Sequence, residues 1–198
     1  MKQRTAEVSR KTGETDIRIR LNLDGDPKNS EIDSGVGFLN HMLDLLARHG
    51  GMELHVFCRG DTDVDDHHST EDIGIALGTA IAEALGERKG IRRYASLALP
   101  MDEALVLCAL DISGRGGLYW DVKFPTEKIG TFDTELVQEF MNALAMNAGI
   151  TLHLRMLAGT NSHHIAEACF KGFARALREA MSEDARFKNS VPSTKGVL

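Results

Sequence analysis

The amino-acid sequence predicts an α+β protein made by internal duplication, with helices packed between two β-sheets. The motif His-His-x-x-Glu occurs at His67 and again 96 residues later at His163, and each copy opens a long segment with helical apolar spacing. The segments before the motifs also match, at an offset of 98, where residues 54–56 (Leu-His-Val) correspond to residues 152–154 (Leu-His-Leu). Each half therefore repeats one plan of strands, short helix, strand, loop and long helix.

The first half contains these elements in that order. Alternating apolar residues predict a strand over 16–23, and apolar residues at helical spacing predict a short helix over 38–49. A further strand is expected over 53–58. The long helix then begins at His67, and its broad apolar stripe predicts that one face is buried.

The second half repeats the plan. Its expected elements are strands over 96–99, 104–111 and 118–124, a short helix over 135–147, a strand over 151–156 and a long helix from 163. Both long helices have broad apolar stripes, so we expect these two helices to pack together with the sheets outside them. The chain divides into half-repeats 1–90 and 91–187 and a tail, 188–198, within one compact unit. Composition alone predicts that this tail is disordered.

The overall charge and composition exclude several classes of protein. Lys and Arg total 23 against 29 Asp and Glu, a formal charge of -6, which argues against nucleic-acid binding. No apolar run is long enough to span a membrane, and the opening residues lack the apolar segment of a secretory signal, so we expect a cytoplasmic protein. The three cysteines are scattered and predict neither a disulfide framework nor a thiolate zinc site.

The duplicated motif predicts a metal centre. Successive helical residues turn by about 100°, so the two histidines and the glutamate of each motif fan out from one end of a helix. The offset of 98 also places His41 opposite Glu139, each on the polar side of a short helix. Eight candidate ligands result, enough for two sites of four: His41, His67, His68, Glu71, Glu139, His163, His164 and Glu167. Imidazole and carboxylate donors without thiolate suit Mn, Fe or Zn, and open positions on an octahedral ion favour Mn(II).

Two other functions fit such ligands. One is a carboxylate-bridged di-metal oxidoreductase, although there the usual order is Glu-x-x-His and glutamate predominates. The other is a metal-storage shell without chemistry. A storage shell has no need of the basic residues Arg93, Arg115 and Lys195.

The chain resembles the imidazoleglycerol-phosphate dehydratase family, in its monofunctional form, over essentially its whole length. The segments that carry the resemblance are GVGFLNHMLDLLARHG (35–50), DDHHSTEDIGIALG (65–78), MDEAL (101–105), DISGR (111–115), NAGITLH (147–153), NSHHIAEACFKGFARALREA (161–180) and PSTKGVL (192–198). The resemblance implies a ribosomal protein S5 domain 2-like fold. It also implies a hydro-lyase of histidine biosynthesis, which converts D-erythro-imidazoleglycerol phosphate to imidazole-acetol phosphate.

The resemblance further implies two Mn(II) ions per active site. One ion would take His41, His68, His163 and Glu167, and the other would take His67, Glu71, Glu139 and His164. Many family members have histidine where this chain has Glu139. Glu14 and Glu167 would carry protons. The implied substrate contacts are Glu14, His41, His49, His67, His68, Glu71, Arg93, Arg115, His163, Lys171, Ser193 and Lys195, with the last two forming a phosphate clamp in the tail. The implied partners are a small phosphorylated imidazole and further copies of the chain, in an octahedral assembly of twenty-four with sites at subunit interfaces.

Overall fold

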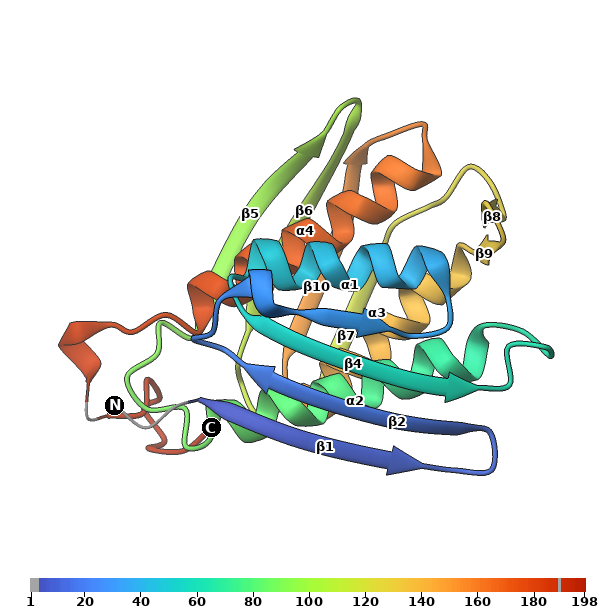
Figure 1. The fold of residues 1–198 in the computed structure, drawn as a ribbon. Coiled ribbons are helices and arrows are strands. Elements are labelled where there is room, and N and C mark those ends of the chain that lie inside the picture. The colour runs from blue at the N-terminus through green and yellow to red at the C-terminus, as the bar shows by residue number, and fades with distance from the viewer. Residues whose placement is uncertain (1–3, 189) are drawn as a thin grey trace.

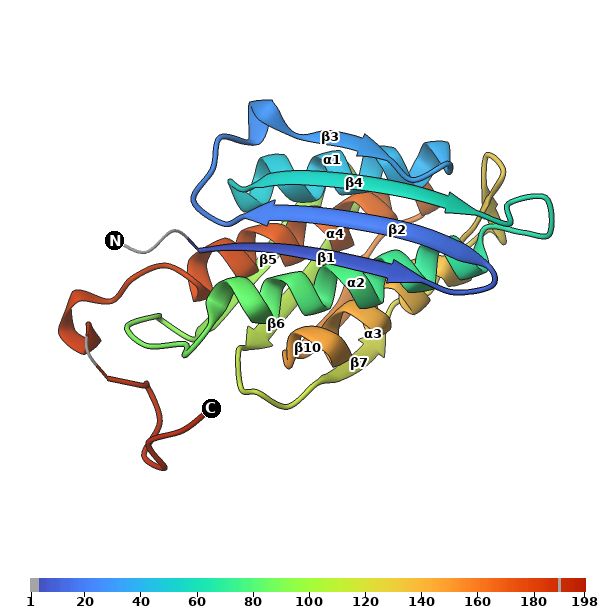
Figure 2. The same cartoon turned by 60° about the horizontal axis from the view of Figure 1, so that its bottom comes forward.

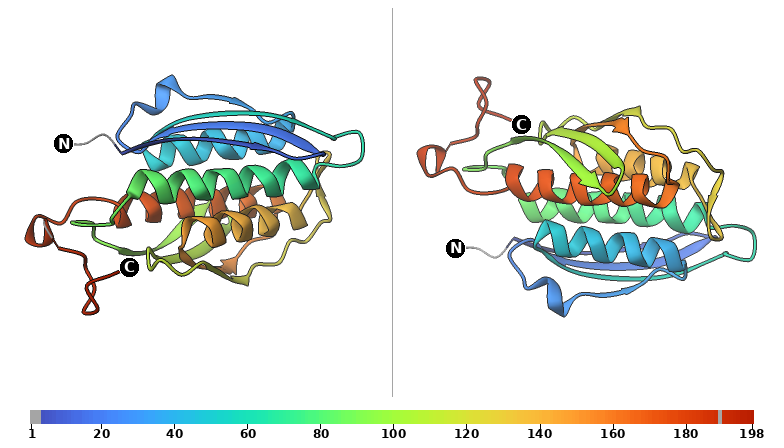
Figure 3. Two further views of the ribbon diagram at one scale, coloured as in Figure 1. Left: turned by 90° about the horizontal axis from the view of Figure 1, so that it is seen from below. Right: turned by 90° about the horizontal axis from the view of Figure 1, so that it is seen from above.

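A computed structural model describes residues 4–188 and 190–198 and shows two four-stranded sheets enclosing a layer of helices (Figure 1). The layering is plain in Figure 3, where the helices lie between the sheets. The predicted α+β class, with helices between sheets, is therefore confirmed. Within the described ranges, no helix combines the length and the apolar character needed to cross a membrane.

The first sheet and its helices come from the first half of the chain. The elements are β1 (Thr5–Lys11), β2 (Thr15–Asn22), the 3-10 helix η1 (Pro27–Asn29), β3 (Glu31–Asp33), α1 (Gly37–Gly50), β4 (Glu53–Gly60) and α2 (His67–Leu85). The strand order is β1-β2-β4-β3, as Figure 2 shows, and β3 pairs with β4 in parallel. Every second residue of β2 and β4 faces the helices and is buried.

The second half supplies the other sheet. Its elements are β5 (Tyr94–Met101), β6 (Ala104–Asp111), β7 (Gly117–Asp121), β8 (Lys128–Ile129), β9 (Phe132–Asp133), α3 (Glu135–Ala148), β10 (Thr151–Ala158), α4 (Ser162–Ala180) and the 3-10 helix η2 (Ala185–Phe187). The order β5-β6-β10-β7 repeats the topology of the first sheet, with β7 parallel to β10. The duplication predicted from the sequence is therefore present in the strand order as well as in the motifs.

Equivalent residues end and begin the helices of the two halves. Gly51 and Gly149 follow the short helices with the same left-handed backbone, φ 65° and ψ 40°, which glycine adopts without steric cost. At the start of each long helix, the side chain two residues before the first histidine accepts a hydrogen bond from the N–H of that histidine. The acceptors are Asp65 for His67, at 2.8 Å, and Asn161 for His163, at 2.9 Å.

The sequence analysis missed the strands β1 and β3 and the short β8–β9 hairpin. Strand β1 alternates exposed with only half-buried residues because it lies at the edge of its sheet, so its apolar signal is weak. Strand β3 has three residues. The strand expected over 118–124 ends at Asp121, and the one expected over 96–99 extends over Tyr94–Met101.

The helix pairing also differs from the expectation. Each long helix packs along the short helix of the other half, α2 against α3 and α4 against α1, rather than chiefly against the other long helix. Helix α2 approaches α3 closely because Gly74 and Gly78 lack side chains. A Cβ atom at Gly78 would lie 2.5 Å from the carbonyl oxygen of Leu144. Buried residues of both halves form one continuous hydrophobic core, which includes the three free cysteines.

The close approach of α2 to α3 predicts that Gly78→Ala destabilises the fold. Alanine normally favours a helix by about 0.5–1 kcal/mol relative to glycine, but here the added methyl group meets backbone, and overpacking costs about 1–3 kcal/mol. We expect a lower urea midpoint for Gly78→Ala. Gly172→Ala in α4 is the matched control, because its nearest new contact is an ordinary one at 3.4 Å, and it should unfold at the wild-type midpoint or above. Equal midpoints for the two variants would contradict this account.

Candidate metal centre and substrate cleft

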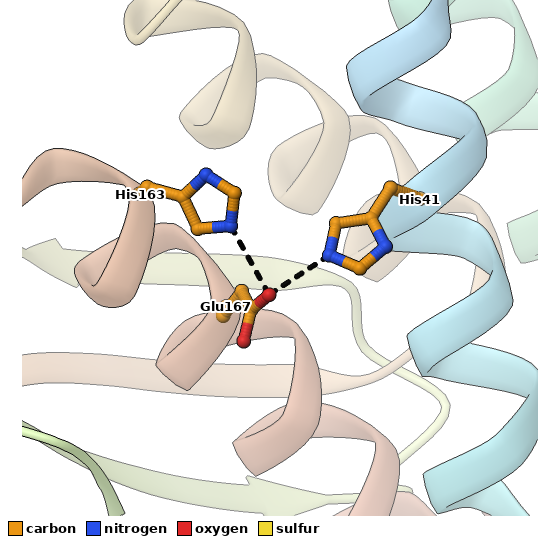
Figure 4. A group of neighbouring side chains, drawn as sticks. All are labelled: His41, His163 and Glu167. Atoms are coloured by element: carbon orange, nitrogen blue, oxygen red, sulfur yellow. Dashed lines mark hydrogen bonds and ion pairs between the residues drawn. The ribbon is translucent and has the colours of Figure 1, made fainter.

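Two histidines converge on one buried carboxylate where α1 packs against α4 (Figure 4). Glu167 Oε1 lies 2.8 Å from His41 Nε2 and 3.1 Å from His163 Nε2. His163 and Glu167 share a face of α4 because they are four residues apart, and His41 reaches them from α1. In the described part of the chain, this is the one group of three or more such side chains with ligand atoms all within 4.8 Å of one another.

Hydrogen bonds hold Glu167 in its ionised form. Only 6% of this residue is exposed, and burial by itself would raise the pKa of the carboxyl group. Hydrogen bonds from Lys171, His41 and His163 outweigh the burial and bring the pKa down to about 2. The carboxylate is therefore ionised at neutral pH and can act as a ligand.

The donor set fits a divalent transition metal. Two imidazole nitrogens and one carboxylate oxygen converge without any thiolate, which suits Mn, Fe or Zn. Three of the four residues expected to hold one ion are thus together in a single chain. The fourth, His68, lies in the first turn of α2 and contacts Asp61 instead of this group.

The ligands expected for the second ion are arranged on α2 and α3 much as the first three are on α4 and α1. His67 Nε2 lies 3.9 Å from Glu71 Oε2, four residues further along α2. Glu139 is half-buried on α3, which packs along α2. His41 has the corresponding place on α1, which packs along α4, but is exposed. His164, the fourth member, is placed elsewhere and contacts Glu103.

The second histidine of each pair lies beside a carboxylate that the sequence did not point to. His68 Nδ1 is 3.0 Å from Asp61 Oδ2, and its Nε2 is 3.7 Å from Glu14 Oε1. The hydrogen bond with Asp61 raises the pKa of His68. The signal for Asp61 was weak, because it lies in an acidic loop that reads as solvated surface.

His164 has the same kind of surroundings. Its Nδ1 is 2.7 Å from Glu103 Oε2, and its Nε2 is 3.6 Å from Asp102 Oδ2. The hydrogen bond raises the pKa of His164 and, together with backbone N–H groups, lowers the pKa of Glu103 to about 2. Both acidic residues lie in the segment MDEAL, which was quoted for the family resemblance without a role.

Four of the expected substrate contacts line one cleft beside the tail. The cleft has a volume of about 650 Å³, and its lining includes Arg93, Arg115, Ser193 and Lys195. Arg93 is paired with Asp111, at 2.7 Å, and its Nη1 donates a hydrogen bond to the carbonyl oxygen of Pro192, also at 2.7 Å. The tail is therefore attached to the body, contrary to the expectation from composition alone; Asn189 lies outside the described residues.

The tail cleft and the His-His pairs lie at opposite ends of the molecule. Both long helices begin at the end away from the chain termini, and the tail follows the other end of α4 (Figures 1 and 2). Helix α4 has 19 residues and is therefore about 28 Å long. His49, at the end of α1, lines a separate cleft of about 660 Å³ with Arg175 and Arg178. One chain does not bring all the predicted residues to one place.

Comparison with known proteins gives one consistent result. The family model for imidazoleglycerol-phosphate dehydratase matches residues 34–177. The imidazoleglycerol-phosphate dehydratase of Jannaschia sp. (strain CCS1) is 60% identical over 195 residues, which cover 98% of this chain and 100% of that protein. The corresponding protein of Cereibacter sphaeroides (strain KD131 / KCTC 12085) is 57% identical with the same coverage.

Solved structures agree with the sequence relatives. The crystal structure of imidazoleglycerol-phosphate dehydratase from Staphylococcus aureus subsp. aureus N315 has a TM-score of 0.83 and 42% identity, covering 91% of this chain and 99% of that chain. The enzyme from Pyrococcus furiosus, in complex with (S)-C348, has a TM-score of 0.83 and 38% identity, covering 96% and 100%. These matches decide against a di-metal oxidoreductase and a storage shell. The chain belongs to the imidazoleglycerol-phosphate dehydratase family and is accordingly a hydro-lyase.

Proposed function

We propose that this chain catalyses the manganese-dependent loss of water from D-erythro-imidazoleglycerol phosphate, giving imidazole-acetol phosphate in histidine biosynthesis. The observation that carries the proposal is the convergence of His41, His163 and Glu167 in a member of this dehydratase family. Glu167 is ionised and both Nε2 atoms lie next to it, so one divalent ion could take all three ligands by displacing the protons shared between the imidazoles and the carboxylate. An enzyme acts where its phosphorylated substrate is made, and we place it in the cytoplasm.

Two ions per site would be held by two sets of this chain's residues. One set is His41, His68, His163 and Glu167, and the other is His67, Glu71, Glu139 and His164. When bound, the metals supply Lewis acidity toward the imidazole ring of the substrate. Glu139 is a carboxylate donor where many relatives have histidine.

The loss of water needs a group that accepts a proton from carbon and a group that protonates the departing hydroxyl. We assign Glu14 and Glu167 to these transfers. Glu14 is exposed on the β1–β2 turn, within 3.7 Å of His68, and is free to reach a bound substrate. Glu167 lies beside His41 and His163, so it would be within reach of a substrate held at the proposed metals.

The tail cleft supplies the chemistry for the phosphate group. Arg93, Arg115 and Lys195 are cations and Ser193 is a hydroxyl donor, and all four line the cleft. Charge-assisted hydrogen bonds to phosphate are stronger than neutral ones. Lys171 and His49, on α4 and α1, complete the proposed substrate contacts.

A complete site requires more than one copy of the chain. In each set, two ligands lie on one long helix and a third lies on the short helix packed against it. The fourth ligand, His68 or His164, lies on the other long helix and contacts Asp61 or Glu103 instead. The tail cleft and the His-His pairs lie at opposite ends of the molecule, separated by the length of α4, a helix of about 28 Å. We therefore propose that sites form at subunit interfaces, in an octahedral assembly of twenty-four copies.

Removal of divalent metal should abolish turnover and weaken the assembly, because the histidine and glutamate ligands lose their shared partner. The measurement is imidazole-acetol phosphate formation before and after chelation, together with light scattering for the size of the assembly. Restoring Mn(II) alone should restore both. Full turnover by protein with verified absence of metal would contradict the proposal.

Lys195→Ala should impair the reaction while leaving fold and metal content intact, since this side chain is assigned to the phosphate. One charge-assisted hydrogen bond is worth about 1.5–3 kcal/mol, which corresponds to roughly a 10- to 150-fold loss in kcat/KM. Lys123→Ala, a matched change at an exposed lysine, should keep wild-type kinetics. Unchanged kinetics in Lys195→Ala would remove this residue from the site.

Mixing of two inactive variants tests the shared site. His68→Ala damages only first-half ligands and His163→Ala only second-half ligands, so each homo-oligomer should be inactive. In random mixed assemblies, about a quarter of the sites combine an intact His163 of one chain with an intact His68 of its neighbour, and activity should return. Persistent inactivity of verified mixed assemblies would show that the ligands belong to one chain.

A further inference from the structure

The second histidine of each pair is held by a carboxylate at the same ring nitrogen. Asp61 Oδ2 lies 3.0 Å from Nδ1 of His68, and Glu103 Oε2 lies 2.7 Å from Nδ1 of His164. The two carboxylates do not occupy equivalent positions in the two halves. Asp61 lies in the loop between β4 and α2, whereas Glu103 lies in the turn between β5 and β6. The duplication of the chain therefore does not by itself explain the shared arrangement.

Glu103 is itself fixed in place. Its Oε1 accepts hydrogen bonds from the backbone N–H groups of Thr160, at 3.1 Å, and Asn161, at 2.8 Å. Asn161 in turn caps α4 through the N–H of His163. Only the second oxygen, Oε2, is left to face His164. The carboxylate thus connects the β5–β6 turn to the start of the helix that carries the ligands.

Asp61 is fixed in a different way. Its side chain is one-quarter exposed, and its Oδ1 is buried without a hydrogen-bond partner in the described residues. Oδ2 faces His68. The side chain of Asp61 therefore makes its one hydrogen bond with His68.

A carboxylate at Nδ1 decides which nitrogen of a neutral imidazole is free. The ring has one N–H and one lone pair, and a carboxylate accepts but does not donate, so the N–H is placed on Nδ1 and the lone pair on Nε2. The Nε2 atoms of His68 and His164 face Glu14 and Asp102, the exposed ends of the two hairpin turns. The free lone pair of His68 thus points toward the proposed proton carrier Glu14, and that of His164 points toward the equivalent turn of the second sheet.

We propose that Asp61 and Glu103 are positioning residues that orient His68 and His164 so that Nε2 of each ring binds the metal. The inference rests on the metal sites of the proposed function and adds two residues to them. Removing such an orienting partner typically weakens metal binding 10- to 100-fold. Each carboxylate serves one histidine, so each loss should affect one of the two classes of metal site.

Glu103→Gln is the most informative variant. One side-chain oxygen must still accept from the backbone of Thr160 and Asn161, so the amide NH2 is turned toward His164 and presents a donor to Nδ1. The N–H of His164 is then displaced to Nε2, where it blocks the metal. We expect 10- to 100-fold weaker Mn(II) binding at half of the sites and wild-type binding at the others, measured by titration with the EPR signal of free Mn(II).

The amide variant of Asp61 is expected to behave differently from that of Glu103. Its Oδ1 has no hydrogen-bond partner in the described residues, so the amide of Asp61→Asn can turn its oxygen toward His68 and keep an acceptor there. We expect Asp61→Asn to weaken Mn(II) binding less than Asp61→Ala. Asp63→Asn, in the same loop and with the same change in charge, is the matched control and should bind Mn(II) like the wild type.

A double-mutant cycle separates orientation from a general role in folding. If Glu103 acts through His164, Glu103→Gln should cause no further loss of Mn(II) affinity in a His164→Ala background. A purely structural role, in which Glu103 only holds the loop at Thr160, predicts instead that Glu103→Gln binds Mn(II) like the wild type. That result, or additive losses in the double variant, would overturn the inference. Failure of the wild-type protein to bind Mn(II) would instead overturn the proposed metal sites.

Discussion

The packing of each long helix against the short helix of the other half is the constraint on which the site depends. Helix α4 lies on α1, which brings His41 to His163 and Glu167, although they are far apart in the sequence. Helix α2 lies on α3, where Gly74 and Gly78 allow the backbones to approach closely. A looser pairing would leave Glu167 without its partner on α1. The two halves therefore share one core, and the ligand sets depend on both.

The carboxylate at the centre of the cluster shows how charge is accommodated at this interface. A buried carboxylate is costly unless it is hydrogen-bonded and paired with cations. Lys171 and the two imidazoles meet that need for Glu167, and they hold its pKa at about 2. The side chains that stabilise the Glu167 carboxylate are also those assigned to metal and substrate. The hydrogen bonds to Glu167 fix the relative positions of these side chains, and fixed positions are the condition for placing ligands accurately.

Sequence reasoning succeeded where a signal was local or repeated. The duplicated His-His-x-x-Glu motif predicted both long helices, and the glycines at 51 and 149 end equivalent short helices with equal backbone angles. It failed where the signal depended on the neighbouring element. Strand β1 is an edge strand with no buried residue, and Asp61 and Glu103 became notable only through their distances to His68 and His164.

The sequence by itself determined the duplication, the class of fold and the family, and it nominated the candidate metal ligands. These follow from periodicity and from motifs whose members lie within a helical turn or two of one another, where covalent geometry limits the possible arrangements. Only the tertiary structure decided which helices pair and which histidine nitrogen faces a carboxylate. It also placed the tail cleft and the His-His pairs at opposite ends of the folded molecule. Those features depend on how loops and separate elements pack against one another, and local periodicity carries no information about the distances between them.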